Sequence, residues 1–92
     1  MISFNPETES TIELEKKITE VKQIVLYNDN INTFDHVIDC LIKICKHEPE
    51  QAEQCAYIVH YKGKCFVKSG EFKKLKPLCE GLLEKGLSAA IE

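Results

Sequence analysis

No stretch of this sequence approaches the roughly 20 consecutive apolar residues that a membrane-spanning helix needs. The beginning of the chain, MISFNPETESTIELEKK, has neither the basic start nor the apolar segment of a signal peptide. We therefore expect no membrane partner and a protein that remains in the cytoplasm, where it is made.

Basic residues are not in excess either, because 12 lysines and arginines stand against 15 aspartates and glutamates, a net charge of −3. Proteins that bind nucleic acid through its phosphates need a concentrated basic surface. The lysines within residues 62–76 could form only a local patch. We therefore expect no nucleic-acid partner.

The sequence also lacks the cysteine and histidine spacing of a metal site. It has no C-x₂-C or H-x₃-H pair, so we expect no metal and no cofactor. The 5 cysteines are an odd number and fall inside periodic apolar patterns, as buried thiols do in a reducing compartment. They are Cys40, Cys45, Cys55, Cys65 and Cys79.

Apolar residues are plentiful, at 43% of the chain, and they are grouped in runs that can form one thin core. Residues 1–21 are the exception, because they are polar and their few aliphatic side chains follow no clear period. We expect a flexible N-terminal arm at 1–21 and a single core domain at 22–92.

Within that domain the periodicity of apolar residues predicts alternating strands and helices. Pro77 is awkward inside a helix, so the turn before it should be loose or kinked. The expected strands are 22–27, 64–68 and 87–91, and the expected helices are 33–46, 49–61 and one that is well formed from about residue 76. This β-α-α-β-α-β order predicts a two-layer α+β fold, with three helices on one face of a three-stranded, mostly antiparallel sheet.

The stretch QIVLYNDNINTFDHV, residues 23–37, carries the strongest functional pattern. Its strand ends in Asn28-Asp29-Asn30, short polar side chains that favour turns, and Asn32 or Thr33 can cap the helix that follows. A cluster of acceptors therefore reaches a helix start beside apolar side chains. Such a place suits a cationic group next to a hydrophobic pocket.

Three segments, IVLYNDN, NTFDHVIDCL and IVHYKGKC, resemble the ClpS family, adaptors of the Clp protease, and the resemblance covers about residues 23–92. The resemblance implies a receptor for N-degrons, which are N-terminal bulky hydrophobic residues such as Leu, Phe, Tyr or Trp. It implies delivery of those substrate proteins to a Hsp100-type unfoldase, ClpA or ClpC, for degradation by ClpP. The protein would be an adaptor without enzymatic activity.

Several of these side chains have the hydrogen-bond acceptors that an N-terminal residue requires. Its α-ammonium has three donors, which must be satisfied when they are buried. Asn28, Asp29 and His60 can offer acceptors, and protonation of His60 at acidic pH should then weaken binding. The resemblance places the pocket and its rim at Asn30, Asn32, Phe34, Val37, Ala56, Val59 and Leu87.

Three positions depart from what relatives often carry. Asn30 stands in place of Asp, which removes a negative charge, and Ala56 stands in place of a large residue such as Met. Phe34 replaces an aliphatic side chain and could refill part of the space left at 56. By weak analogy, Glu71, Lys74 and Lys76 are expected to contact the unfoldase.

Other interpretations remain open at this point. The domain could be a generic interaction module for a different peptide. A less favoured alternative is a metal-binding protein that uses Cys40, Cys45 and His47, with His36 one turn before Cys40. A nucleophile pair of His60 with Cys55 or Cys65 is also conceivable. However, Cys55 and His60 are separated by about 140° around a helix and do not face each other.

Overall fold

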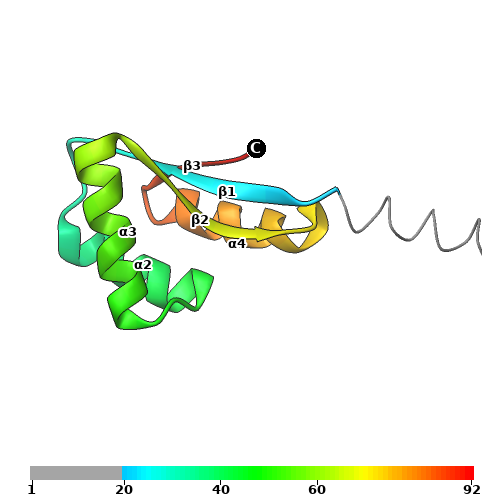
Figure 1. The fold of residues 1–92 in the computed structure, drawn as a ribbon, viewed down its shortest axis with the longest axis horizontal. Helices are drawn as coiled ribbons and strands as arrows, with labels where there is room; N and C mark the ends of the chain where they lie inside the picture. The colour runs from blue at the N-terminus through cyan, green and yellow to red at the C-terminus, as the bar shows by residue number, and fades with distance from the viewer. Residues whose placement is uncertain (1–19) are drawn as a thin grey trace, which may run out of the picture.

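The computed structural model of the protein describes residues 20–92, so the arm predicted at 1–21 lies almost entirely outside the described residues. The described chain has the expected β-α-α-β-α-β order (Figure 1). Its elements are β1 (Lys22–Tyr27), α2 (Phe34–Cys45), α3 (Pro49–Lys62), β2 (Lys64–Gly70), α4 (Phe72–Glu84) and β3 (Ser88–Ile91).

The sheet is three-stranded, with β1 in the centre and antiparallel to both β2 and β3. Side chains alternate between the two faces of a strand. Ile24 and Leu26 accordingly join the main core, whereas Val25 lies opposite Phe66 and Ala90. Ile24, Val25 and Leu26 are all buried, although only Ile24 and Leu26 belong to the main core.

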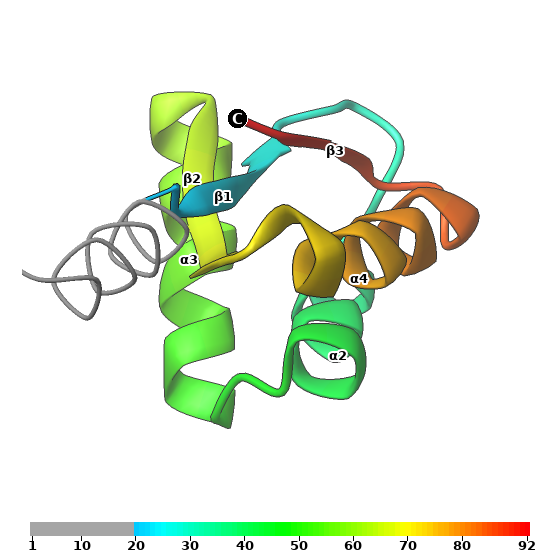
Figure 2. The same ribbon diagram turned by 90° about the vertical axis from the view of Figure 1, so that its right-hand side faces the viewer.

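The three helices pack against the same face of the sheet, as Figures 1 and 2 show from two directions. In Figure 2, α3 lies beside β2 and α4 lies closer to β3. The core between these layers contains buried residues from every helix, including Leu41, Val59 and Leu82. The predicted two-layer α+β architecture is thus confirmed.

Local signals explain the ends of α2 and α3. Thr33 is the N-cap of α2, and its hydroxyl accepts a hydrogen bond from the His36 N–H at 3.1 Å. Gly63 ends α3 with a positive φ of 97°, a conformation that side chains other than glycine rarely adopt. Its carbonyl accepts a hydrogen bond from the Asn28 N–H at 2.9 Å, which brings the end of α3 to the end of β1.

The prediction for the third helix was wrong at its start. A regular helix already begins at Phe72, before residue 76, and Pro77 lies inside it. The first turn is closed onto the Glu71 carbonyl by hydrogen bonds of 3.0 Å. Pro77 removes only the bond to the Lys73 carbonyl, and Lys73 is exposed, so water can replace that bond.

Candidate functional site

A surface pocket of about 290 Å³ lies where β1, α2 and α3 meet. The loop after β1 and His60 form its polar side, and the start of α2 and the other lining residues of α3 form its apolar side. Its lining is Asn28, Asp29, Asn30, Asn32, Phe34, Val37, Ala56, Val59 and His60. The fold thus brings together every residue predicted for the ammonium and the pocket except Leu87.

Asp29 organises the polar side of this pocket through its own loop. One carboxylate oxygen accepts hydrogen bonds from the backbone N–H groups of Ile31 (2.9 Å) and Asn32 (2.8 Å). The other oxygen accepts one from the Asn32 side-chain amide at 2.8 Å. A carboxylate offers roughly four acceptor positions, so about one remains for a ligand.

These hydrogen bonds also determine the ionisation of Asp29. The bond from the Asn32 backbone N–H contributes most to holding the pKa of the Asp29 carboxyl below its ordinary value. The partial burial of the side chain acts in the opposite direction and is outweighed. The carboxylate therefore stays negatively charged at neutral pH and faces a pocket that has no lysine or arginine in its lining.

Asn32 also connects this loop to the turn between α4 and β3. Its amide nitrogen donates to the Gly86 carbonyl at 2.9 Å as well as to Asp29. The neighbouring Lys85 carbonyl lies 2.9 Å from His36 Nε2. Two side chains near the start of α2 thus bind two successive carbonyls of a turn that is distant in sequence.

The apolar side of the pocket is formed by side chains with little exposure. Ala56 and Val59 are buried in α3, and Val37 in α2 is half-buried. A smaller hollow of about 20 Å³, called the inner extension below, adjoins the pocket and shares with it Asn28, Asp29, Asn32, Val37 and Val59. Leu87, only 3% exposed, lines this inner extension and not the outer pocket.

An aromatic cluster, consisting of Phe34, Tyr57, His60 and Tyr61, borders the mouth of the pocket. The Phe34 ring lies 5.0 Å from that of Tyr57 and 5.3 Å from the imidazole of His60, measured between centroids. Tyr57 and Tyr61 are stacked at 6.0 Å. Phe34 remains 37% exposed and lines the same pocket as the small, buried Ala56.

Two functional features escaped the sequence analysis. Tyr57 stands one helical turn before Tyr61, a spacing that could have revealed the aromatic cluster. The bond of His36 to Lys85 joins positions far apart in the chain, and no local pattern signals it. Glu71, Lys74 and Lys76 are exposed around the start of α4 and do not line the pocket.

The cysteines behave as small core side chains, as predicted. All five are free, four of them are buried, and Cys65 is half-buried. Burial raises the pKa of Cys45 to about 11 and that of Cys55 to about 12, so both stay protonated thiols at neutral pH. Cys55 is buried whereas His60 is exposed on the same helix, which disfavours a nucleophile pair.

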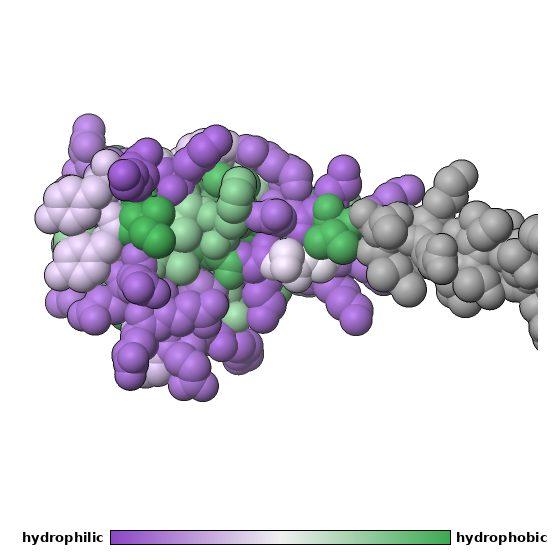
Figure 3. Space-filling view, viewed as in Figure 1, coloured by the Kyte–Doolittle hydropathy of each residue, from purple (hydrophilic) through white to green (hydrophobic). Residues whose placement is uncertain are grey.

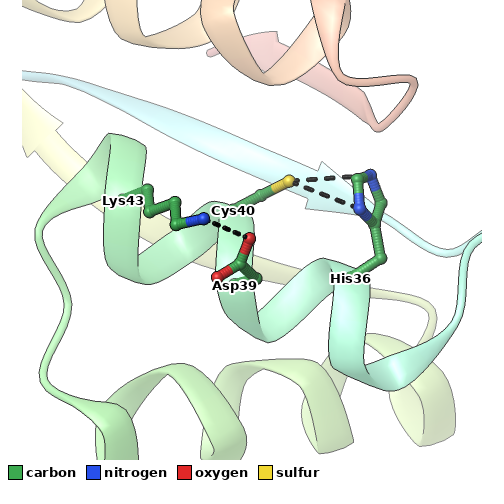
Figure 4. Close-up of polar contacts among 4 residues, drawn as sticks. All are labelled: His36, Asp39, Cys40 and Lys43. Atoms are coloured by element: carbon green, nitrogen blue, oxygen red, sulfur yellow. Dashed lines mark hydrogen bonds and ion pairs between the residues drawn. The ribbon is translucent and has the colours of Figure 1, made fainter.

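His36 does lie beside a cysteine, as Figure 4 shows, with its Nε2 atom 3.6 Å from the Cys40 sulfur. Burial raises the pKa of the Cys40 thiol, so this contact joins a histidine to a neutral thiol. Within residues 20–92, no three ligating side chains converge on a possible metal position.

Two larger hollows lie elsewhere on the described surface. The hollow of about 680 Å³ is lined mainly by glutamate and glutamine side chains around the start of α3, and that of about 390 Å³ by polar and apolar side chains of β1, β2 and the α2–α3 region. Figure 3 shows a mostly hydrophilic face on which apolar side chains gather where α3 and β2 meet. No helix in the described part of the chain is both long and apolar enough to span a bilayer.

The pocket joins two chemical environments within one small volume. One side offers a carboxylate, amide oxygens and an imidazole, and the other offers aliphatic and aromatic side chains. Sites that recognise small groups commonly combine an apolar lining with a few convergent polar groups. A group that is both cationic and apolar fits this combination best.

Comparison with known proteins gives a consistent result. A family model described as "ATP-dependent Clp protease adaptor protein ClpS" matches residues 17–90. The ClpS adapter of Thermosynechococcus vestitus is 35% identical over 69 residues, which cover 74% of this chain and 73% of that protein. The chloroplastic adapter CLPS1 of Chlamydomonas reinhardtii is 29% identical over 84 residues, 90% of this chain and 52% of that longer protein.

Among solved structures, Agrobacterium tumefaciens ClpS2 bound to L-phenylalaninamide superimposes with a TM-score of 0.72. The match covers 78% of this chain and 94% of that one at 18% sequence identity. At this identity the likeness concerns the fold.

Proposed function

The chain belongs to the ClpS family of ATP-dependent Clp protease adaptors, and on this premise we propose that its pocket binds N-degrons. The ligand is the first residue of a substrate protein, with a free α-amino group and a bulky hydrophobic side chain. The observation that carries this proposal is the placement of the Asp29 carboxylate beside the apolar lining of one pocket.

The polar side of the pocket would bind the α-ammonium. Asn28 offers an amide oxygen, Asp29 the acceptor position that its loop leaves free, and neutral His60 a ring nitrogen. An acetylated amine has lost its charge and two of its donors, so these acceptors would remain unpaired. Unpaired polar groups cost free energy, and this penalty gives the selectivity for a free N-terminus.

The apolar side would bind the first side chain. Val37, Ala56 and Val59 form the wall, Phe34 covers the rim, and Leu87 lies at the base of the inner extension. Burial of a side chain such as Leu or Phe is worth about 1.5–3 kcal/mol. Asn30 is exposed at the edge of the polar side and would face the first peptide groups.

Delivery requires a second surface for the unfoldase. We propose a Hsp100 partner of the ClpA or ClpC type, acting with ClpP, and a cytoplasmic location. The exposed charges of Glu71, Lys74 and Lys76 at the start of α4 are our candidates for this contact. They lie outside the pocket lining, so substrate and unfoldase could bind together.

The decisive experiment titrates the protein with a fluorescent Leu-starting peptide and with its N-acetylated twin. We expect acetylation to weaken binding by at least about tenfold, because the charge and two donors are lost. A peptide with the same composition and Ala in first position controls for the side chain. Equal affinity for all three peptides would instead indicate a generic peptide-binding module.

The role of His60 can be tested separately by substitution. Its imidazole can accept a hydrogen bond from an ammonium, and His60→Ala removes that acceptor. The affinity for the Leu-starting peptide should therefore fall in His60→Ala, whereas the affinity for the N-acetylated twin should change much less. An equal change for both peptides would remove His60 from the ammonium site.

A further inference from the structure

We propose that His36 is a positioning residue that sets the depth of the pocket by holding the turn between α4 and β3. This inference rests on the proposed N-degron site, because it concerns the size of the first side chain that the site accepts. His36 does not line the pocket and would act through Leu87.

The contact is well defined. A carbonyl oxygen can only accept, so the 2.9 Å contact between His36 Nε2 and the Lys85 carbonyl assigns the proton to Nε2. The ring also packs against the buried Cys40, one turn along α2 (Figure 4). Asn32 binds the next carbonyl, that of Gly86, at 2.9 Å, so the turn is held at two successive points.

These side chains matter because burial does not fix the turn. Lys85 and Gly86 are both exposed. Apart from these bonds, the described contacts of the turn are backbone hydrogen bonds to the end of α4, such as that from Gly86 N–H to Leu83 at 3.0 Å. Gly86 has a φ of 89°, a region that glycine adopts without strain, and the carbonyls of Lys85 and Gly86 are bound by the side chains of His36 and Asn32.

Leu87 follows the turn immediately, is buried in the core and lines the inner extension. The inner extension that it lines has only about 20 Å³, too little for more than a small group. A large first side chain must therefore either stay in the outer pocket or displace Leu87. With the turn held by His36 and Asn32, Leu87 resists this displacement and limits the size of the ligand.

The test compares Leu-starting and Trp-starting peptides on the full chain. In the natural protein we expect the Trp-starting peptide to bind more weakly. In His36→Ala the turn is released, and the ratio of the two dissociation constants should shrink by about fivefold. His36→Gln, whose amide nitrogen can donate to the Lys85 carbonyl, should restore the ratio.

A general loss of stability must be separated from this effect. Ile44→Val removes a methyl group from α2 where it packs against α4 at Gly81, and it leaves the bonds of His36 and Asn32 to the turn in place. It should destabilise the protein without changing the ratio. Hydrogen exchange provides a second readout, because the amides of Gly86 and Leu87 should exchange faster in His36→Ala and not in Ile44→Val.

Two results would overturn the inference: a peptide ratio in His36→Ala equal to that of the natural protein, or equal binding of the two peptides by the natural protein. Failure of the proposed function would look different. In that case N-acetylation would leave the affinity of the natural protein unchanged, whichever first residue is used.

Discussion

At the scale of single residues, Asp29 has two tasks in the loop after β1. Its carboxylate accepts three hydrogen bonds that shape the loop, and its charge faces the proposed ammonium position. Because these bonds lower its pKa in the folded state, they stabilise the fold above the unfolded value of 3.8. This contribution is lost as the pH falls through the lowered folded value.

We therefore predict that Asp29→Asn lowers the free energy of unfolding by about 1 kcal/mol at about pH 7. The difference from the natural protein should shrink as the pH falls below 3.8 and through the lowered pKa of the folded state, where the natural carboxylate becomes protonated. Urea denaturation at about pH 7 and across this acidic range measures this. Asp39→Asn, in an exposed pair with Lys43, is the matched control and should change little. A difference that does not change with pH would contradict the role of the charge.

Ala56 is one of the three pocket positions that depart from the residues we expect in relatives. It is 3% exposed and lines the pocket together with Phe34. Ala56→Met should fill the pocket wall and make the site more selective, because pocket differences of this size are worth about 1–3 kcal/mol.

Because Ala56 leaves space in the pocket, the natural protein should bind Leu-starting and Ile-starting peptides with similar affinity. Ala56→Met should instead bind the Leu-starting peptide about tenfold more tightly than the Ile-starting one. Competition for a fluorescent Leu-starting peptide measures both affinities. Thermal unfolding of the variant shows whether the larger side chain fits. Identical selectivity of the two proteins would mean that Ala56 does not bound the first side chain.

At the scale of elements, Gly81 in α4 and Gly63 after α3 form an informative pair. A Cβ atom at Gly81 would lie 3.5 Å from Ile44, an ordinary contact, in a helix that alanine favours. A Cβ atom at Gly63 would meet nothing within 4 Å, yet its φ of 97° is strained for other residues. Both positions have room for a methyl group, but only at Gly63 does the backbone conformation disfavour alanine.

We predict that Gly81→Ala raises the free energy of unfolding by about 0.5–1 kcal/mol. Gly63→Ala should lower it by about 1 kcal/mol, because alanine must adopt the positive φ that ends α3. Chemical denaturation of the two variants provides the measurement, and each serves as the control for the other. A destabilising Gly81→Ala would show that α2 and α4 pack too closely at Ile44 for a methyl group.

The elements also show why some features were predictable from the sequence. Periodicity and turn residues predicted the two strands and two helices before residue 70 closely, because Thr33, Pro49 and Gly63 carry strong local signals. The start of α4 was missed because proline generally disfavours the interior of a helix. Here Pro77 removes one backbone hydrogen bond on an exposed turn, where water can replace it, so the helix continues.

Some features of the candidate site could likewise be predicted from the sequence, and others could not. Asn28, Asp29 and His60 could be proposed because they belong to recognisable short segments. The bond from His36 to Lys85 and the inward position of Leu87 depend on how α4 meets β3, which no local pattern encodes.

At the scale of the whole molecule, we predict that the site and the arm at 1–21 act separately. Among the described residues, those that line the pocket and its inner extension lie between Leu26 and Leu87. Within the same residues 20–92, the buried core that supports them runs from Ile24 to Leu87. The family resemblance implies that the arm is the part that the unfoldase engages. Removal of the arm should therefore abolish delivery to the unfoldase without abolishing peptide binding.

Deletion of residues 2–20 should leave the affinity for a Leu-starting peptide unchanged within about twofold, since the lining of the pocket is intact. Delivery of a Leu-starting reporter protein to ClpA with ClpP should fail, as measured by its rate of degradation. A variant with the same arm residues in shuffled order separates length from sequence: it should still deliver if the unfoldase needs only a polar chain to engage. If the deletion abolished peptide binding as well, the arm would be part of the folded core, because a segment that only engages the unfoldase contributes nothing to the pocket.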